Sequence, residues 1–331
     1  MNAEQLSFAG LTATLKAAGE TTRLRILALL AEAELTVSDL TEILRQSQPR
    51  LSRHLRLLAE AGLVERFREG AWAFFRLGER GSTADIARAL IARLNLDDPI
   101  TARDRERLAA VRAARAAAAQ NYFRRHAAQW DRIRKLHVAD AAVEDAIRAA
   151  LADKPVRALL DLGTGTGRML ELFAGDIERG LGLDLSLDML ALARARLDRA
   201  GLKHCSVRHG DIYDLALPRD SFDVVIIHQV LHFLDDSASA IREAARVLRP
   251  GGRLLVIDFA PHDLEFLREE HAHRRLGFTA ETVTQWLEAA GLDVLRQQTI
   301  PPGPEGKIAV ALWLARDPRI LLARPAAREV A

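Results

Sequence analysis

The sequence of 331 residues is poor in cysteine, lysine and long apolar runs. Its single cysteine, Cys205, excludes a disulfide within the chain and a cysteine-based zinc site. No run of about 18 apolar residues is present, and the first residues lack the basic-then-apolar pattern of a secretion signal. We therefore expect a cytoplasmic protein with no membrane partner.

Charge alone points to no particular partner. Only five of the 47 basic residues are lysine, a skew that reflects coding bias rather than nucleic-acid binding. The formal net charge is +2, which by itself indicates no polyanionic partner. Its distribution is more informative, because residues 45–68 contain six Arg against two Glu. This stretch predicts a local basic face.

The chain reads as two domains with a helical segment between them, in line with about 150 residues per domain. Residues 1–80 show short helical patterns followed by two strand patterns, at 63–68 and 71–77. Residues 81–119 are rich in Ala, Leu and Arg and predict a long helix, a break at Pro99 and a second helix.

The remainder, residues 120–316, alternates strands and helices. Buried strands are expected at 156–162, 180–185, 223–227 and 253–259, with a late helix at 279–290 and a closing strand at 308–315. Alternating order with uninterrupted apolar strands predicts a Rossmann-like, mostly parallel sheet covered on both faces. Residues 317–331 are expected to form a frayed tail. The predicted fold class is α/β overall.

The first domain has the element order of a winged helix-turn-helix. Thr36 is a predicted helix N-cap with Asp39 three residues on, and Ser47 is expected to cap the next helix, with Pro49 in its first turn. Gly62 ends that helix, and a hairpin with a turn at residues 69–70 follows.

The helix after Ser47 has two faces. Leu51, Leu55 and Leu58 recur at helical spacing and are expected to face the core. The other arc predicts a recognition helix whose first half enters a major groove, while the hairpin contacts phosphate or a minor groove. The predicted DNA-binding residues are Gln48, Arg50, Ser52, Arg53 and His54 on the helix and Arg66 and Arg68 on the wing.

Four ordered segments, at 20–30, 34–40, 47–58 and 62–70, resemble the ArsR/SmtB family of bacterial repressors. The resemblance covers about residues 6–78. It implies a transcriptional regulator that binds pseudo-palindromic operator DNA as a homodimer. Its dimer-forming terminal helices would be residues 4–18 and 82–95.

One departure from this family concerns the signal. Metal-sensing members carry cysteines in the third helix, where this chain has Thr36 and Ser38. The sensor for soft metals is therefore missing, no metal site is predicted, and the signal must come from elsewhere in the chain.

The second domain contains a glycine-rich turn directly after a predicted buried strand. Asp161 is followed by alternating Gly163, Gly165 and Gly167, which let the backbone turn sharply and approach a ligand. The spacing differs from the Gly-x-Gly-x-x-Gly pattern of dinucleotide sites. Asp184 ends the next strand, where a carboxylate can accept hydrogen bonds from ribose hydroxyls.

With Asp211 and Ile212 after a third strand and the segments 121–131 and 247–252, these features resemble class I S-adenosylmethionine-dependent methyltransferases. The resemblance covers about residues 120–315. It implies S-adenosylmethionine (SAM) or S-adenosylhomocysteine (SAH) as cofactor. The implied cofactor-binding residues are Asp161, Gly163, Gly165, Gly167, Asp184, Met189, Asp211 and Ile212.

Histidines supply the candidates for catalysis and substrate binding. His228 ends the fourth strand, where it is either a general base or a histidine that caps the strand beside the cofactor. A later His-x-His pair could hold a metal or an anionic substrate, or lie on a solvated helix. The candidate substrate residues are His232, His271, His273 and Arg274. Arsenite methylation would need several thiolates, and the chain has one.

Two functions of different class remain open. In the first, the chain is an ArsR-type repressor whose second domain binds SAM or SAH as effector. In the second, it is an active methyltransferase of a small molecule, with an autoregulatory DNA-binding head. The sequence leaves open whether the domain catalyses methyl transfer, because nothing in the cofactor turn is degraded.

Overall fold

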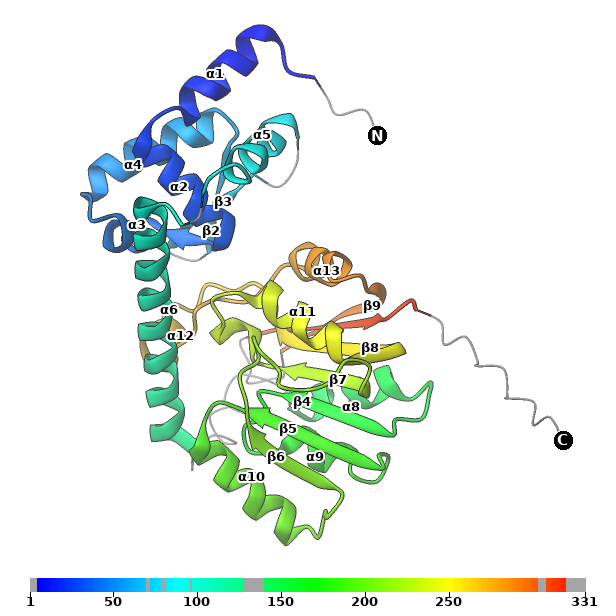
Figure 1. Ribbon diagram of the computed structural model, residues 1–331. Coiled ribbons are helices and arrows are strands. Elements are labelled where there is room, and N and C mark those ends of the chain that lie inside the picture. The colour runs from blue at the N-terminus through cyan, green and yellow to red at the C-terminus, as the bar shows by residue number, and fades with distance from the viewer. Residues whose placement is uncertain are drawn as a thin grey trace, which may run out of the picture. The chain divides into compact units, whose positions relative to one another are not determined.

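The computed structural model describes residues 5–69, 72–78, 81–95, 97–127, 140–302 and 308–319. The chain divides into two compact units, residues 1–118 and 119–331 (Figure 1). One helix, α6, contributes residues to both units.

The first unit is a helical domain with a small sheet. Its elements are α1 (Phe8–Ala18), α2 (Thr21–Glu32), β1 (Leu35–Thr36), α3 (Val37–Leu44), α4 (Gln48–Glu60), β2 (Val64–Glu69), β3 (Trp72–Leu77), α5 (Ser82–Ile91) and most of α6 (Pro99–His126). The strands form an antiparallel sheet in the order β1-β3-β2. The expected winged helix-turn-helix order is present.

The predicted cap of α3 forms in full. Thr36 Oγ1 accepts a hydrogen bond from Asp39 N at 3.2 Å, and Asp39 Oδ2 accepts one from Thr36 N at 2.9 Å. This reciprocal capping box satisfies two backbone donors that the start of a helix leaves open. Thr36 therefore has a structural role at the start of α3.

The cap of α4 differs from the prediction. Ser47 has the extended backbone of an N-cap residue, and Pro49 lies in the first turn, but the Ser47 side chain accepts no hydrogen bond from the helix. Proline supplies no N–H and already fixes φ, so the helix can begin without that side-chain bond. The end is as expected, because Gly62 has a left-handed φ of 68°.

The segment between the predicted domains consists of two helices of unequal length. The expected long helix before Pro99 is α5, which ends at Ile91, whereas α6 begins at Pro99 and runs to His126. The first half of α6 packs into the core of the first unit through Leu108 and Val111. Asp104 on the same helix accepts a bidentate pair from Arg25 at 2.6 and 2.7 Å.

The second unit is an α/β domain. Its elements are the end of α6, α8 (Asp140–Leu151), β4 (Ala158–Leu162), α9 (Arg168–Phe173), β5 (Arg179–Asp184), α10 (Leu187–Arg199), β6 (Cys205–His209), β7 (Phe222–His228), η2 (Leu231–Phe233), α11 (Ser237–Val247), β8 (Leu248–Phe259), α12 (Phe266–His271), α13 (Ala280–Ala289), β9 (Asp293–Ile300) and β10 (Val310–Arg316).

Its seven strands form one sheet in the order β6-β5-β4-β7-β8-β10-β9. The first five are parallel, and β10 is antiparallel to both of its neighbours. The chain runs outward from β4 through β5 to β6 and then returns to β7 on the other side of β4. This reversal makes the carboxyl ends of β4 and β7 the topological switch point of the sheet, the position at which open α/β sheets bind ligands.

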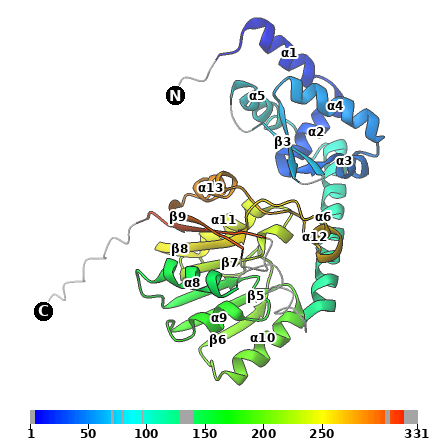
Figure 2. The same cartoon turned by 180° about the vertical axis from the view of Figure 1, so that it is seen from behind.

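Helices cover both faces of this sheet. One core contains side chains of α11 and α13, and the other contains side chains of α8, α9 and α10 (Figures 1 and 2). Successive residues of one strand alternate between the two cores, as Val224 and Val225 of β7 do. The doubly covered, mostly parallel sheet predicted from the apolar runs is confirmed.

Two features near the end of the chain differ from expectation. Strand β9 was not predicted, because it is an edge strand with mostly exposed polar residues and no apolar run. The expected tail begins with an anchored segment: Asp317 is buried, and its N and O atoms hydrogen-bond Gly252 O and Gly251 N.

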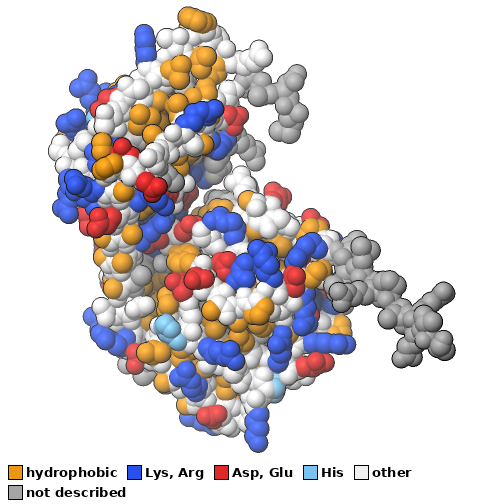
Figure 3. Space-filling model, viewed as in Figure 1, with side chains coloured by type: hydrophobic (Ala, Val, Ile, Leu, Met, Phe, Trp, Pro, Cys, Tyr) orange, Lys and Arg blue, Asp and Glu red, His pale blue; other side chains and the backbone are white. Residues whose placement is uncertain are grey.

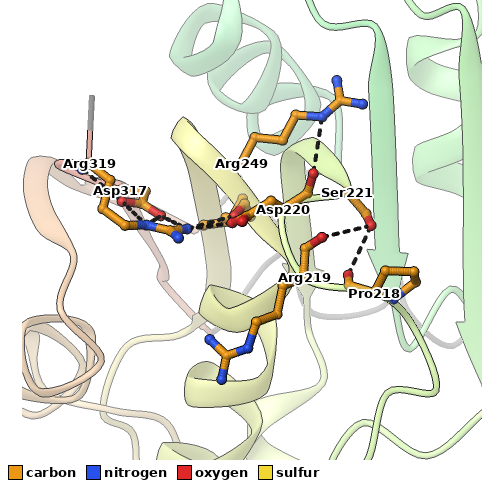
Figure 4. A network of polar contacts seen from close by, with 8 residues as sticks. Pro218, Arg219, Asp220, Ser221, Arg249, Asp317 and Arg319 are labelled. Carbon is orange, nitrogen blue, oxygen red and sulfur yellow. Dashed lines mark hydrogen bonds and ion pairs between the residues drawn. The ribbon is translucent and has the colours of Figure 1, made fainter. Parts of the chain in front are cut away.

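Arg319 extends this anchor (Figure 4). Its guanidinium pairs with Asp317 and with Asp220 at 2.8 Å, and it donates to Leu248 O at 3.0 Å. Residues 317–319 therefore pack on the second unit, and the rest of the predicted tail, 320–331, lies outside the described residues.

Candidate functional sites

Helix α4 presents four of the five predicted recognition residues to solvent. Leu51, Leu55 and Leu58 are at most 1% exposed, as their spacing predicts. The opposite arc carries the exposed side chains, which are Gln48, Arg50, Ser52 and Arg53. The amide and two guanidinium groups on this arc have the donors that read adenine and guanine edges.

His54 does not share that exposed surface. Its side chain is 14% exposed, and its Nδ1 lies 3.6 Å from Oε2 of Glu20, the N-cap residue of α2. Burial lowers the pKa of His54, an effect that the Glu20 carboxylate partly opposes. The sequence pattern grouped His54 with its helical neighbours, whereas the structure places it at the contact between α2 and α4.

The two predicted wing arginines, Arg66 and Arg68, are exposed on β2. The hairpin of β2 and β3 that carries them is stabilised by ring contacts. Phe67 stacks on Phe74 with ring centroids 5.7 Å apart, and the Arg76 guanidinium lies 5.3 Å from the centre of the Phe67 ring. Both arginines have the same parity on the strand and therefore extend from one face of the hairpin. Gly70, in the predicted turn, lies outside the described residues.

The glycine-rich turn of the second unit has the left-handed backbone that its sequence predicts. Gly163, Gly165 and Gly167 have φ values of 68°, 53° and 82°. A Cβ atom at Gly163 would lie 2.4 Å from Cγ2 of Val230, in the segment that follows β7. The turn is therefore packed against the carboxyl end of β7 and has no room for a side chain at Gly163.

Two carboxylates organise this turn. Asp184, at the end of β5, accepts hydrogen bonds from Gly165 N and Ser186 N, each at 2.8 Å. Asp161, which is 2% exposed, accepts one from Thr164 Oγ1 at 2.7 Å. Burial raises the pKa of Asp184, and the backbone hydrogen bonds work against that shift.

These residues fit a ribosyl ligand. An ionised carboxylate offers about four acceptor positions, and the bonds that Asp184 accepts from Gly165 N and Ser186 N leave capacity for sugar hydroxyls. Asp211 is exposed and Ile212 is buried beside it, so one carboxylate and one apolar side chain are available to a base. Met189, the remaining predicted cofactor residue, is 1% exposed in the first turn of α10.

The predicted substrate histidines separate into two groups. His232 and His273 lie together, with ring centroids 4.3 Å apart. His271 instead bonds through Nδ1 to the Tyr122 hydroxyl at 2.6 Å. The two members of the His-x-His pair therefore face different partners, and Arg274 is held by Asp235 at 2.8 Å.

His232 forms a buried pair that the sequence did not reveal. Its Nδ1 lies 2.7 Å from Oδ1 of Asp258, and the two side chains are 2% and 0% exposed. Asp258 is the penultimate residue of β8, which is the parallel neighbour of β7. Its place at the end of a predicted strand was the one available signal, since parallel strands end at a common edge.

His228, the predicted base, is the last residue of β7 and is partly buried. Gln229 follows with a left-handed φ of 56° and an exposure of 6%. A strained backbone at a buried polar residue is characteristic of ligand sites. In the described ranges of the chain, no group of three His, Cys, Asp or Glu side chains is arranged to hold a metal ion.

Comparison with known families agrees with both halves of this description. Residues 20–66 match the model of bacterial regulatory proteins of the arsR family, and residues 160–256 match a methyltransferase domain model. The chain thus carries an arsR-family helix-turn-helix region followed by a methyltransferase domain, of the kind that binds SAM or SAH. The resemblances inferred from the motifs are confirmed.

Individual relatives match part of the chain. A protein of Mycolicibacterium smegmatis named as a probable SAM-dependent methyltransferase is 35% identical over 183 residues, which are 54% of this chain and 62% of that protein. An arsenite methyltransferase of Aquipseudomonas alcaligenes is 42% identical over 110 residues, 30% of this chain and 32% of that protein. The chain therefore spans between about a third and three fifths of the length of these two relatives.

Solved structures similar to the chain include SAM-dependent methyltransferases. One from Mesorhizobium loti has 24% identity and a TM-score of 0.45, covering 53% of this chain and 97% of that one. Another from Aquifex aeolicus has 21% identity and a TM-score of 0.42, covering 53% and 88%. Across the described residues, no helix combines the length and apolar character needed to cross a bilayer.

Proposed function

We propose that this chain is an ArsR-type transcriptional repressor whose methyltransferase domain binds SAM or SAH as the signal. The observation that carries the DNA-binding half is the division of α4 into a buried leucine face and an exposed Gln48, Arg50, Ser52 and Arg53 face. Such a helix, followed by a hairpin with two exposed arginines, suits a major groove and its flanking phosphates. A function on chromosomal DNA places the protein in the bacterial cytoplasm.

A homodimer on a two-fold operator follows from this proposal. Helix α1 supports it with an exposed apolar stripe, since Phe8 is 89%, Leu11 39% and Leu15 47% exposed. These three residues recur at intervals of three and four and therefore share one helix face. Hydrophobic side chains also gather on the face of the first unit that is visible in Figure 3. A second copy of the chain is the partner that we assign to this stripe.

The signal enters through the glycine turn. Asp184 joins Gly165 to Ser186, so a ligand that bonds this carboxylate also fixes the turn and the start of α10. A ligand changes operator affinity only by as much as it prefers one conformation of the protein. A tenfold preference corresponds to about 1.4 kcal/mol, and near-complete switching needs a preference of roughly 10⁴-fold.

The test measures operator binding by the full chain. A duplex selected from a random-sequence pool by the protein serves as probe, and its affinity is measured by fluorescence anisotropy without ligand, with SAM and with SAH. We expect a several-fold change with at least one ligand. Identical binding curves at saturating ligand would refute cofactor-linked control, and failure to select any duplex would refute the DNA-binding function.

A second function, methylation of a small molecule, is favoured by the buried His232–Asp258 pair at the end of β8. The acceptor is not arsenite in this proposal, because the chain has one cysteine and burial raises the pKa of that thiol. Transfer of a labelled methyl group from SAM to an added acceptor tests this function. An absence of transfer to every acceptor would leave the ligand-binding role alone.

A further inference from the structure

The residues around His232 form a cluster of rings at the carboxyl ends of β7 and β8. The ring of His232 contacts Phe233 at 4.0 Å, His273 at 4.3 Å and Phe259 at 4.6 Å between centroids. Phe123, near the end of α6, meets Phe233 edge to face at 4.8 Å. We refer to these five side chains and Asp258 as the ring cluster.

We propose that His232, oriented by Asp258, accepts the proton from a flat hydroxyl-bearing acceptor, a phenol or an enol, during methyl transfer. This inference rests on the second function above and adds the acceptor class and the base. The sequence had singled out His228 for that role.

The hydrogen bonds of His232 define which ring nitrogen can act as base. A carboxylate accepts only, so the 2.7 Å contact with Asp258 Oδ1 places the proton on Nδ1. Among the described residues, the hydrogen bonds of this side chain all pass through Nδ1, so Nε2 keeps its lone pair for an incoming proton. A carboxylate behind an imidazole fixes its tautomer and stabilises the imidazolium that forms.

Asp258 is itself held rigidly. Its Oδ1 accepts from Phe259 N at 2.7 Å, and its Oδ2 accepts from His232 N at 3.3 Å. The same residue therefore positions both the backbone and the ring of His232. Because Asp258 is fully buried, its charge acts on the imidazole with little screening by water.

The position of His232 relates it to the cofactor turn. Val230, two residues earlier, lies so close to Gly163 that a Cβ there would be 2.4 Å from Cγ2. The segment carrying the base is thus in contact with the turn that we assign to the cofactor. Methyl transfer requires the acceptor atom close to the methyl group and in line with the bond that breaks.

The acceptor class follows from the walls of the cluster. Besides the base, the cluster has four rings: three Phe side chains and His273, which stacks on Phe259 at 9° and 5.6 Å. Arg274, the nearest arginine in sequence, is already paired with Asp235. Such walls favour a flat aromatic ring by stacking.

His262 offers a second polar group to an acceptor bound in the ring cluster. Its ring lies 5.9 Å from Phe259, and its Nε2 is buried without a hydrogen-bond partner among the described residues. Burial, with a further contribution from His232, lowers the pKa of His262 to about 4. A neutral imidazole of this kind can bond a second hydroxyl or a carbonyl on the acceptor ring.

The step balances without a further reagent. The acceptor hydroxyl gives its proton to Nε2 of His232, and its oxygen forms a bond to the methyl carbon of SAM. The carbon–sulfur bond breaks, and its electron pair stays on sulfur, which leaves SAH. The imidazolium, paired with Asp258, then returns its proton to water.

The test uses the full chain, labelled SAM and a series of substituted catechols and phenols whose hydroxyl pKa runs from above to below the assay pH. We expect the wild type to methylate members of the series. His232→Gln should lower kcat about 10²-fold or more for the weakly acidic phenols, the usual contribution of a general base. The loss should shrink for phenols that are already ionised, because these need no base.

A matched control is His204→Gln, which alters an exposed histidine bonded to Ala174 O before β6 and should leave the series unchanged. An equal loss across the whole series for His232→Gln would show a structural role and overturn the proposal. A loss that depends on phenol acidity in His228→Gln instead would transfer the role to His228. Failure of the wild type to methylate any phenol would refute the acceptor class.

A second readout does not depend on turnover. In protein carrying ¹⁵N-labelled histidine and no ligand, NMR should show His232 as the Nδ1–H tautomer, and Asp258→Asn should abolish that preference. The opposite tautomer in the wild type would overturn the assignment. SAH affinity, measured by calorimetry on the same variants, should stay unchanged, which separates failure of this inference from failure of cofactor binding.

Discussion

Arg115 on α6 forms an ion pair with Asp39, the residue that closes the capping box of α3. Asp39 thus uses one oxygen for the start of the helix-turn-helix and the other for α6. Further along the same helix, Tyr122 bonds His271 at 2.6 Å. Helix α6 therefore has polar attachments in both units. If the proposed control of operator binding by SAM or SAH is correct, we expect α6 to carry it.

Replacing Arg115 should weaken that control. We expect Arg115→Gln to reduce the effect of SAH on operator affinity by about 0.5–2 kcal/mol, the range by which residues between coupled sites alter coupling. Operator affinity without ligand and SAH affinity without DNA should change less. The measurement is anisotropy of operator DNA with and without SAH.

Arg105→Gln is the control for that variant. It lies on the same helix, but its pair with Glu32 at 2.8 Å is about half exposed, and pairs of that kind contribute little. An equal reduction of the SAH effect in both variants would indicate a general disturbance of α6 and would contradict a specific role for the Arg115–Asp39 pair.

The exposed face of α4 should determine operator affinity. Arg53→Ala should weaken specific binding by about 1–3 kcal/mol if it reads a base, or lower the salt dependence by about one charge if it contacts phosphate. SAH affinity should not change. Arg56→Ala removes another exposed arginine, which pairs with Glu60 in the second half of the helix. We expect a smaller effect there, and the reverse order would contradict the proposed docking.

Asp184 should make cofactor binding depend on pH. Its ionised carboxylate accepts hydrogen bonds from sugar hydroxyls more strongly, and at more positions, than the protonated acid does. Because burial raises its pKa, protonation begins at a higher pH than for an ordinary aspartate, and SAH affinity should fall as the pH is lowered through that range. Calorimetry across acidic pH measures this. Asp184→Asn should bind more weakly and lose that component of the pH dependence.

Gly163 tests the contact between the cofactor turn and the segment after β7. Gly163→Ala should lower both thermal stability and SAH affinity, because its Cβ would overlap Val230 and its φ of 68° disfavours a side chain. Adding Val230→Ala should restore part of the loss by removing the overlap, while the backbone cost of about 1–2 kcal/mol remains. No recovery in the double variant would contradict the packing described here.

The sequence predicts those features of the structure that follow from a residue pattern within a single helix or strand. The buried face of α4 follows from the spacing of Leu51, Leu55 and Leu58, and the parallel strands follow from apolar runs. The capping box of α3 was equally readable, since Thr36 and Asp39 are three residues apart. Each of these is decided by neighbours in the chain.

Features that depend on distant residues were missed. His54 was assigned to the exposed arc because helical spacing cannot show that Glu20 lies beside it. Likewise, His232 and Asp258 are 26 positions apart and meet only because β7 and β8 are adjacent in the sheet. We propose His232 as the base because Asp258 orients its ring. The positions of the histidines in the sequence do not show this carboxylate partner, so they could not indicate which of His228 and His232 acts as the base.

The most direct test of the account compares operator binding by the wild type and by Asp184→Asn at one salt concentration, without ligand and with SAM or SAH at a concentration that saturates the wild type but not the variant. The account predicts that at least one ligand shifts the wild-type curve several-fold and leaves the variant curve nearly unmoved, with equal affinities in the absence of ligand. A wild-type curve that neither ligand moves, measured with protein shown by calorimetry to bind both, would contradict it.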